Sequence, residues 1–137
     1  MCSSITDSFG RSTYTLVETL MTWQEAFGHC AKLGGHLAVM NGELEYNFTK
    51  ALVEKYETTL IYRRAWLDGT EFLMKGHWRC PSIPGPCPYI NWGDTEPNSS
   101  GTDNCIALYI GPSDRHGMFD YFCGTYRMIS VCEFDCD

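Results

Sequence analysis

Hydrophobic residues in the first third of the chain switch from a strand-like to a helical spacing. Residues 11–19 are rich in β-branched side chains and predict a strand. Thr22 and Glu25 have the spacing of a capping box, which marks the beginning of a helix. Hydrophobic positions then recur at helical spacing until Gly34-Gly35, a pair that predicts the end of this helix.

Another strand and another helix follow. Residues 36–40 predict a short strand, and residues 41–56 predict a helix with one hydrophobic face. The residues expected on that face are Leu44, Phe48, Leu52 and Val53, with Ala51 as an alternative to Val53.

The second half of the chain has a different character. An apolar strand is expected over residues 65–69, and residues 69–103 then hold five of the six prolines with little periodicity of either kind. Residues 104–110 and 127–134 predict two further strands, with a turn over residues 111–117. This order of elements indicates an α+β fold with a long irregular region that is available for binding.

Composition narrows the class of protein. The 137 residues are the size of one domain, so residues 1–137 are interpreted as a single unit. The formal net charge of −7, without a basic run, argues against nucleic acid as a partner. No apolar stretch is long enough for a membrane span.

Eight cysteines are spread along the chain, and none has the spacing of a zinc site. This distribution favours four disulfides in an oxidising compartment, and therefore a secreted, extracellular protein. Cys80 and Cys87 flank a segment rich in proline, which favours a local bridge between them.

Side chains that carry oxygen gather in and after the long irregular region. Glu96, Asn98 and Asp103 lie within it, and Asp120 follows the strand at residues 104–110. Calcium prefers about 6–8 such oxygen ligands. The spacing alone is compatible with a calcium site and also with ordinary solvated loop residues.

Four landmarks, in this order, resemble the C-type lectin domain family over nearly the whole chain. They are the first helix with Trp23 and Cys30, the sequence Trp66-Leu67-Asp68-Gly69, the tripeptide Glu96-Pro97-Asn98 before Cys105, and the closing Cys123 and Val131-Cys132-Glu133. The resemblance implies an α+β fold in which two helices pack on small antiparallel sheets beside a long calcium-binding loop region.

The resemblance also implies disulfide pairings. The family pattern pairs Cys30 with Cys132 and Cys105 with Cys123. Because the family brings its two termini together, Cys2–Cys136 is expected as the remaining pair, and an intermolecular bond is the alternative.

The calcium ligands carried over from the family are Glu96, Asn98, Asp103 and Asp120, and the carbonyl of Asp120 would add a fifth oxygen. In the family the peptide bond before the proline of the tripeptide is cis. Phe119 stands where the family has an asparagine, and its side chain has no oxygen to offer. The Phe119 ring is expected either to stack on a sugar or to pack beneath the loop.

The function that the resemblance implies is calcium-dependent, non-enzymatic carbohydrate binding. In the family, Glu-Pro-Asn goes with mannose-type sugars, so the expected partners are glycans with vicinal hydroxyls, mannose-type first and galactose-type second. Glu96, Asn98, Asp103, Phe119 and Asp120 are the expected carbohydrate-binding residues. One shallow site binds weakly, so a homo-oligomeric recognition or agglutination lectin is expected, with a role in innate immunity.

The departure at Phe119 supports two alternatives. One is galactose-type specificity. The other is a protein-binding or mineral-associated relative of the same fold that does not bind sugar.

Overall fold

The computed structural model describes residues 7–136. Cys2 lies outside the described residues, so the expected Cys2–Cys136 bridge stays a prediction.

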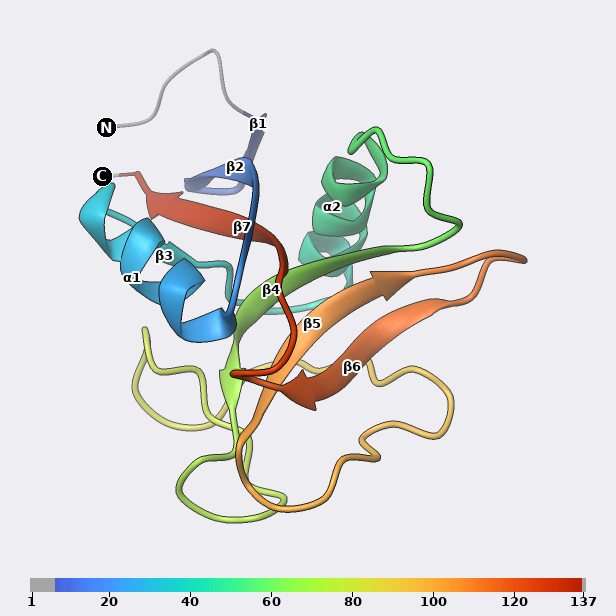
Figure 1. Ribbon diagram of the computed structural model, residues 1–137. Coiled ribbons are helices and arrows are strands. Elements are labelled where there is room, and N and C mark those ends of the chain that lie inside the picture. The colour runs from blue at the N-terminus through green and yellow to red at the C-terminus, as the bar shows by residue number, and fades with distance from the viewer. Residues whose placement is uncertain (1–6, 137) are drawn as a thin grey trace.

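Seven strands form one mixed sheet in the order β1-β2-β7-β4-β5-β6, and β3 pairs with β7 off this path (Figure 1). Their bounds are Asp7–Phe9 for β1, Ser12–Met21 for β2, His36–Leu37 for β3, Arg63–Thr70 for β4, Asn104–Ile110 for β5, His116–Phe122 for β6 and Met128–Asp135 for β7. The strand pairs are antiparallel except β4 and β7, which run parallel. The small antiparallel sheets of the sequence prediction are therefore joined into one sheet by the parallel pair.

The two predicted helices are present as α1, Trp23–Lys32, and α2, Glu43–Glu54. The capping box of α1 is confirmed, because the Thr22 side chain accepts a hydrogen bond from Glu25 N and the Glu25 carboxylate accepts one from Thr22 N. Trp23 is buried, and its indole N–H donates to the carbonyl of Leu67 in β4. This bond fixes the beginning of α1 against the sheet.

The buried face of α2 differs from the predicted one. Leu52 and Val53 are buried as expected, but the Leu44 side chain is 73% exposed, so that prediction is wrong. Glu45 and Tyr46 take its place in the interior. Polar contacts explain the burial of Glu45, whose carboxylate accepts hydrogen bonds from the Tyr14 hydroxyl and from the backbone N–H of Asn41.

Three of the four predicted disulfides are confirmed. Cys30–Cys132 joins α1 to β7, Cys105–Cys123 closes the β5–β6 hairpin, and Cys80–Cys87 closes a short loop. The first two bridges lie in a buried cluster with Trp23 and Trp66. Long-range covalent links therefore coincide with one part of the hydrophobic core.

Residues 71–103 contain no helix and no named strand, and they lie at the end of the sheet away from β1 (Figure 1). Buried polar contacts hold this region in place. The Asp68 carboxylate, 2% exposed as a residue, accepts a hydrogen bond from Ser82 N, and Thr70 and Arg79 form an isolated bridge. Neither helix among the described residues is long and apolar enough to cross a membrane.

Candidate functional site

The carboxylate of Asp120 anchors the Glu96-Pro97-Asn98 segment to the sheet. Asp120 is 3% exposed and lies in β6 opposite Ile106 of β5. Its two carboxylate oxygens accept hydrogen bonds from Asn98 N at 2.9 Å and from Ser99 N at 3.0 Å, and its carbonyl accepts one from Ser99 Oγ at 3.2 Å. Asp120 is thus held beside the tripeptide, although it lies 22 positions from Asn98 in the sequence.

Glu96 completes this arrangement from the other side. Its peptide bond to Pro97 is cis, as the resemblance implies, and its Oε1 accepts a hydrogen bond from Asp120 N at 3.2 Å. Glu96, Asn98 and Asp120 line one open cavity of about 250 Å³. The other residues that line it are Ser99, Phe119, Tyr121, Phe122 and Tyr126. Three of the four predicted calcium ligands are therefore brought together.

The charge of Glu96 is perturbed by this environment. Burial, and next to it the neighbouring Asp120 carboxyl, raise the pKa of Glu96 to about 7. Burial and the repulsion by Asp120 therefore disfavour ionisation of Glu96 at neutral pH. A divalent cation at this place would relieve that repulsion.

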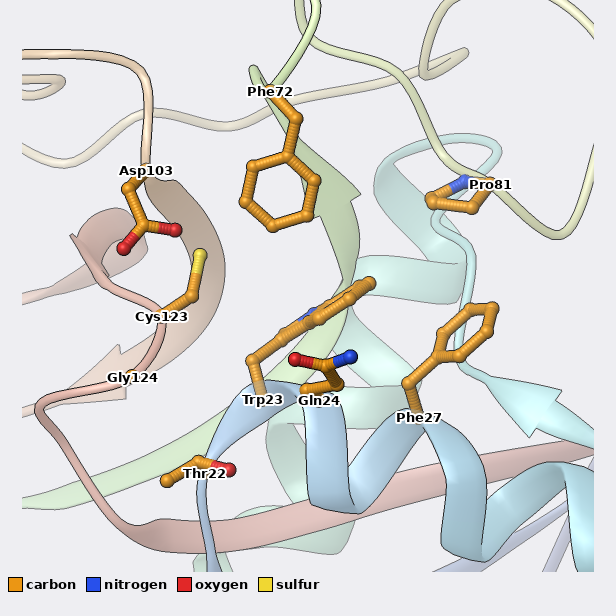
Figure 2. A pocket seen from close by; sticks show the side chains of 9 residues that line it. All are labelled: Thr22, Trp23, Gln24, Phe27, Phe72, Pro81, Asp103, Cys123 and Gly124. Atoms are coloured by element: carbon orange, nitrogen blue, oxygen red, sulfur yellow. The ribbon is translucent and has the colours of Figure 1, made fainter.

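Asp103, the fourth predicted ligand, is placed elsewhere. It is exposed and lines a separate cavity of about 420 Å³ whose walls include the aromatic rings of Trp23, Phe27 and Phe72 (Figure 2). Within residues 7–136, one group of three His, Cys, Asp or Glu side chains places its potential metal-ligand atoms within 4.8 Å of one another. This group does not contain Asp103, Glu96 or Asp120. The backbone carbonyl of Asp103 accepts a hydrogen bond from Cys123 N, which ties this position to the end of β6.

That group of three consists of His36, Glu133 and Asp135. His36 Nε2 lies 3.5 Å from a carboxylate oxygen of Asp135. Both oxygens of Glu133 already accept hydrogen bonds, one from Val39 N and one from Ser12 Oγ. These contacts join the end of β7 to β2, to β3 and to the residue Val39 that follows β3, so the group holds these elements of the fold together.

Phe119 is half-buried, and its ring stacks on Tyr109 with the ring centroids 4.5 Å apart. Gly93 lies so close to the ring that no side chain would fit at that position. The ring therefore packs beneath the segment that precedes the tripeptide, and it also takes part in lining the cavity of Glu96 and Asp120.

A buried polar centre that the sequence pattern did not predict lies behind the loop. Glu71 is 1% exposed and accepts hydrogen bonds from Asn104 Nδ2 at 2.6 Å and from Lys75 Nζ at 3.2 Å. Lys75 Nζ also donates to the carbonyl of Ser99 at 2.6 Å, and Asn104 Nδ2 donates to the carbonyls of Ser100 and Gly101. Most of these residues lie in the irregular segment and Asn104 begins β5, so no periodic pattern pointed to them as a group.

We expect replacement of Lys75 by methionine to destabilise the fold by about 1–3 kcal/mol, because the buried Glu71 carboxylate would lose its cationic partner. The matched control is Lys50→Met. Lys50 forms an ion pair of the same i,i+4 spacing, but its partner Glu54 is 46% exposed, so a loss of only about 0.3–0.5 kcal/mol is expected. Urea unfolding of both variants checks the difference, and equal losses would contradict it.

The model of the Lectin C-type domain matches residues 19–134 of this chain. The chain belongs to the C-type lectin domain family. Ladderlectin of Oncorhynchus mykiss is 32% identical over 118 residues, which are 85% of this chain and 60% of that protein. A type-2 ice-structuring protein of Hemitripterus americanus is 34% identical over 90 residues, which are 66% of this chain and 50% of that protein. The chain thus spans only part of the length of these relatives.

Solved structures of C-type lectins share this fold. The SPL-1 complex with GlcNAc superposes with a TM-score of 0.83 at 20% identity, covering 99% of this chain and 96% of that one. The calcium-independent C-type lectin SPL-2 of Saxidomus purpuratus superposes with a TM-score of 0.81 at 21% identity, covering 99% and 95%. Domains of this family are generally calcium-dependent binding proteins rather than enzymes, but calcium dependence is not universal among them.

Proposed function

We propose that the cavity between Glu96, Asn98 and Asp120 binds glycan hydroxyls with the help of a calcium ion. The observation that carries this proposal is the pair of hydrogen bonds from Asn98 N and Ser99 N to the Asp120 carboxylate, which holds the tripeptide against β6. The three polar side chains then share one open cavity of the size of a sugar ring or larger, about 250 Å³.

The donor set fits calcium in part. Glu96 and Asp120 offer carboxylates, Asn98 offers an amide, and calcium would supply a positive charge that neutralises the acidic pair and attracts hydroxyl oxygens. Asp103 lines another cavity, Phe119 has no oxygen, and the Asp120 carbonyl is engaged by Ser99 Oγ. Because calcium needs about 6–8 oxygens, glycan hydroxyls and water would have to complete the shell, and we expect weak calcium binding unless residues 99–103 move Asp103 inward.

The proposed ligands are mannose-type glycans first and galactose-type glycans second. A carboxylate can only accept hydrogen bonds, whereas an amide can also donate, so Glu96 and Asn98 select which sugar hydroxyl faces which group. The experiment is a glycan array, with calcium and with chelator, on the wild type and on the double variant Glu96→Gln/Asn98→Asp. We expect calcium-dependent binding of mannose-type glycans that shifts toward galactose-type glycans in the double variant. Equal binding profiles of the two proteins would contradict the assignment of the site.

A second candidate is calcium-independent binding, or binding of a ligand that is not a sugar. The position of Asp103 favours it, since one expected ligand lines a different cavity. Melting curves with calcium and with chelator distinguish this candidate from the proposed calcium site, because an ion that binds only the folded protein raises the stability of that protein. Glycan binding that is unchanged by chelator would support the calcium-independent form, and an array without any binding would support the protein-binding or mineral-associated alternative.

Calcium binding is expected to release protons near neutral pH. In the folded, calcium-free protein the pKa of Glu96 is raised to about 7, above its usual value, so its proton stabilises the fold at low pH and this contribution is lost as pH rises through about 7. Calcium needs the deprotonated carboxylate, so its affinity should fall by up to about tenfold per pH unit below 7. Calorimetry in buffers of different ionisation enthalpy measures the number of protons released. This release should be absent in Glu96→Gln and small in the wild type at pH 8.5.

We also propose that the protein acts outside the cell as an oligomeric recognition lectin. The disulfides, which persist in oxidising compartments, support the location. An open site of this kind binds single sugars weakly, so several copies would supply the avidity needed for agglutination. The role that we propose for this agglutination is in innate defence.

A further inference from the structure

Arg64 lies in an unusual setting beside the proposed glycan site. The residue is half-buried in β4, and its guanidinium carbon lies 5.1 Å from the ring centroid of Tyr62, 5.2 Å from that of Tyr121 and 5.4 Å from that of Tyr126. These distances are in the range of cation–π contacts, about 6 Å or less. Three rings therefore orient the guanidinium.

The charge of Arg64 is not neutralised by a neighbouring acid. Among residues 7–136, the ion pairs involve other cations, and no carboxylate pairs with Arg64. One of its five N–H donors contacts the Tyr121 hydroxyl, and Arg64 keeps the others for a ligand. It does so in a chain whose formal net charge is −7.

The three rings around Arg64 and the cavity of Glu96 and Asp120 share two tyrosines. Tyr121 and Tyr126 belong to both, and Tyr121 directly follows Asp120 in β6. Burial raises the pKa of the Tyr121 hydroxyl, and the nearby Arg64 acts in the opposite direction. Arg64 does not itself line the cavity, so a ligand group would reach the guanidinium by extending from the cavity past the Tyr121 and Tyr126 rings.

We propose that the glycan bound in this cavity carries an anionic group, a sulfate ester or a sugar carboxylate, and that Arg64 recognises this group. The inference rests on the proposed function, because Glu96, Asn98 and Asp120 hold the hydroxyls of the same glycan. Planar guanidinium groups bind carboxylate and sulfate-like oxygens through two parallel hydrogen bonds. The three tyrosine rings hold the guanidinium in place beforehand, so less side-chain freedom is lost when the anion binds.

Calcium has a second role in this arrangement. The carboxylates of Glu96 and Asp120 would repel an acidic glycan, and a bound calcium ion would remove that repulsion. The preference for acidic glycans is therefore expected only when calcium is present.

The experiment compares three forms of one mannose-type oligosaccharide: neutral, carrying a sulfate ester, and carrying a carboxylated sugar. In calcium, the wild type should bind at least one acidic form about 10-fold more tightly than the neutral form. Arg64→Met should remove this preference while the neutral form binds as before. Arg64→Lys, which keeps the charge but not the fork, should keep part of it. Arg79→Met, a change of the same charge at an exposed position, should leave the preference intact.

The outcomes separate this inference from the function on which it rests. If the neutral form binds and neither acidic form binds better, the role of Arg64 is overturned and the glycan site stands. If none of the three forms binds to the wild type, both fail. If Arg64→Met and Arg64→Lys weaken neutral and acidic forms equally, Arg64 only supports the tyrosine rings and the inference is overturned. A preference for only one acidic form supports the inference and identifies the anion.

Discussion

Replacing Asp120 by asparagine is expected to reduce calcium-dependent glycan binding by about 100-fold, which corresponds to about 3 kcal/mol. The change removes a negative charge from the proposed calcium site. It also weakens the acceptor pair that holds Asn98 N and Ser99 N, so the tripeptide would lose its anchor on β6. Both effects act on the same site, which is why the expected loss exceeds that of any other single carboxylate there.

The matched control is Asp94→Asn. Asp94 is exposed in the same irregular region and does not line the cavity of Glu96 and Asp120. Its replacement by asparagine removes the same negative charge. Each variant is titrated with calcium and then with a mannose-type glycan, and the two binding affinities are compared between the variants. If Asp120→Asn binds as tightly as Asp94→Asn, the site lies elsewhere in the molecule.

Replacing both Cys30 and Cys132 by serine is expected to cost about 4–5 kcal/mol of unfolding free energy. The bridge spans 102 residues, and constraining a loop of that length removes a large share of the entropy of the unfolded chain. Both side chains are also fully buried, so the new hydroxyl groups would need hydrogen-bond partners in an apolar cluster. Since a domain of this size has about 5–15 kcal/mol in total, we expect the variant to be largely unfolded at 37 °C.

The pair Cys80 and Cys87 provides the comparison. That bridge spans 7 residues, and the same model of loop entropy assigns it only about 2 kcal/mol. Denaturant unfolding of the two double variants should therefore show a much lower midpoint for the long-range pair. Similar midpoints would mean that loop length does not govern the stability that these bridges provide.

Local signals predicted most elements of this fold. The capping box at Thr22 and Glu25 is present, and the strand at residues 104–110 has the predicted bounds. Strand β6 was not predicted, because Gly117 and Asp120 interrupt its hydrophobic alternation. Its strand character comes from pairing with β5 over seven residues, a contact between segments that the alternation of β6 alone does not reveal.

The position of Leu44 shows the same limit inside a helix. Its spacing with Phe48 predicted a buried position, but the interior beside the beginning of α2 is polar, with Glu45 held by Tyr14 and Asn41. Hydrophobic spacing describes a face of a helix and carries no information on whether that face meets hydrophobic or polar neighbours.

The sequence by itself determined the family, three described disulfide pairings and the tripeptide at the proposed site, because cysteine order and Glu96-Pro97-Asn98 are local features that can be matched residue by residue. Tertiary structure alone decided which residues meet. It joined Asp120 to Asn98 and Ser99, placed Asp103 in another cavity, and set Arg64 among three tyrosines. The physical reason is that these contacts depend on how β4, β5 and β6 pair and on the path of an aperiodic loop, neither of which leaves a repeating pattern in the sequence.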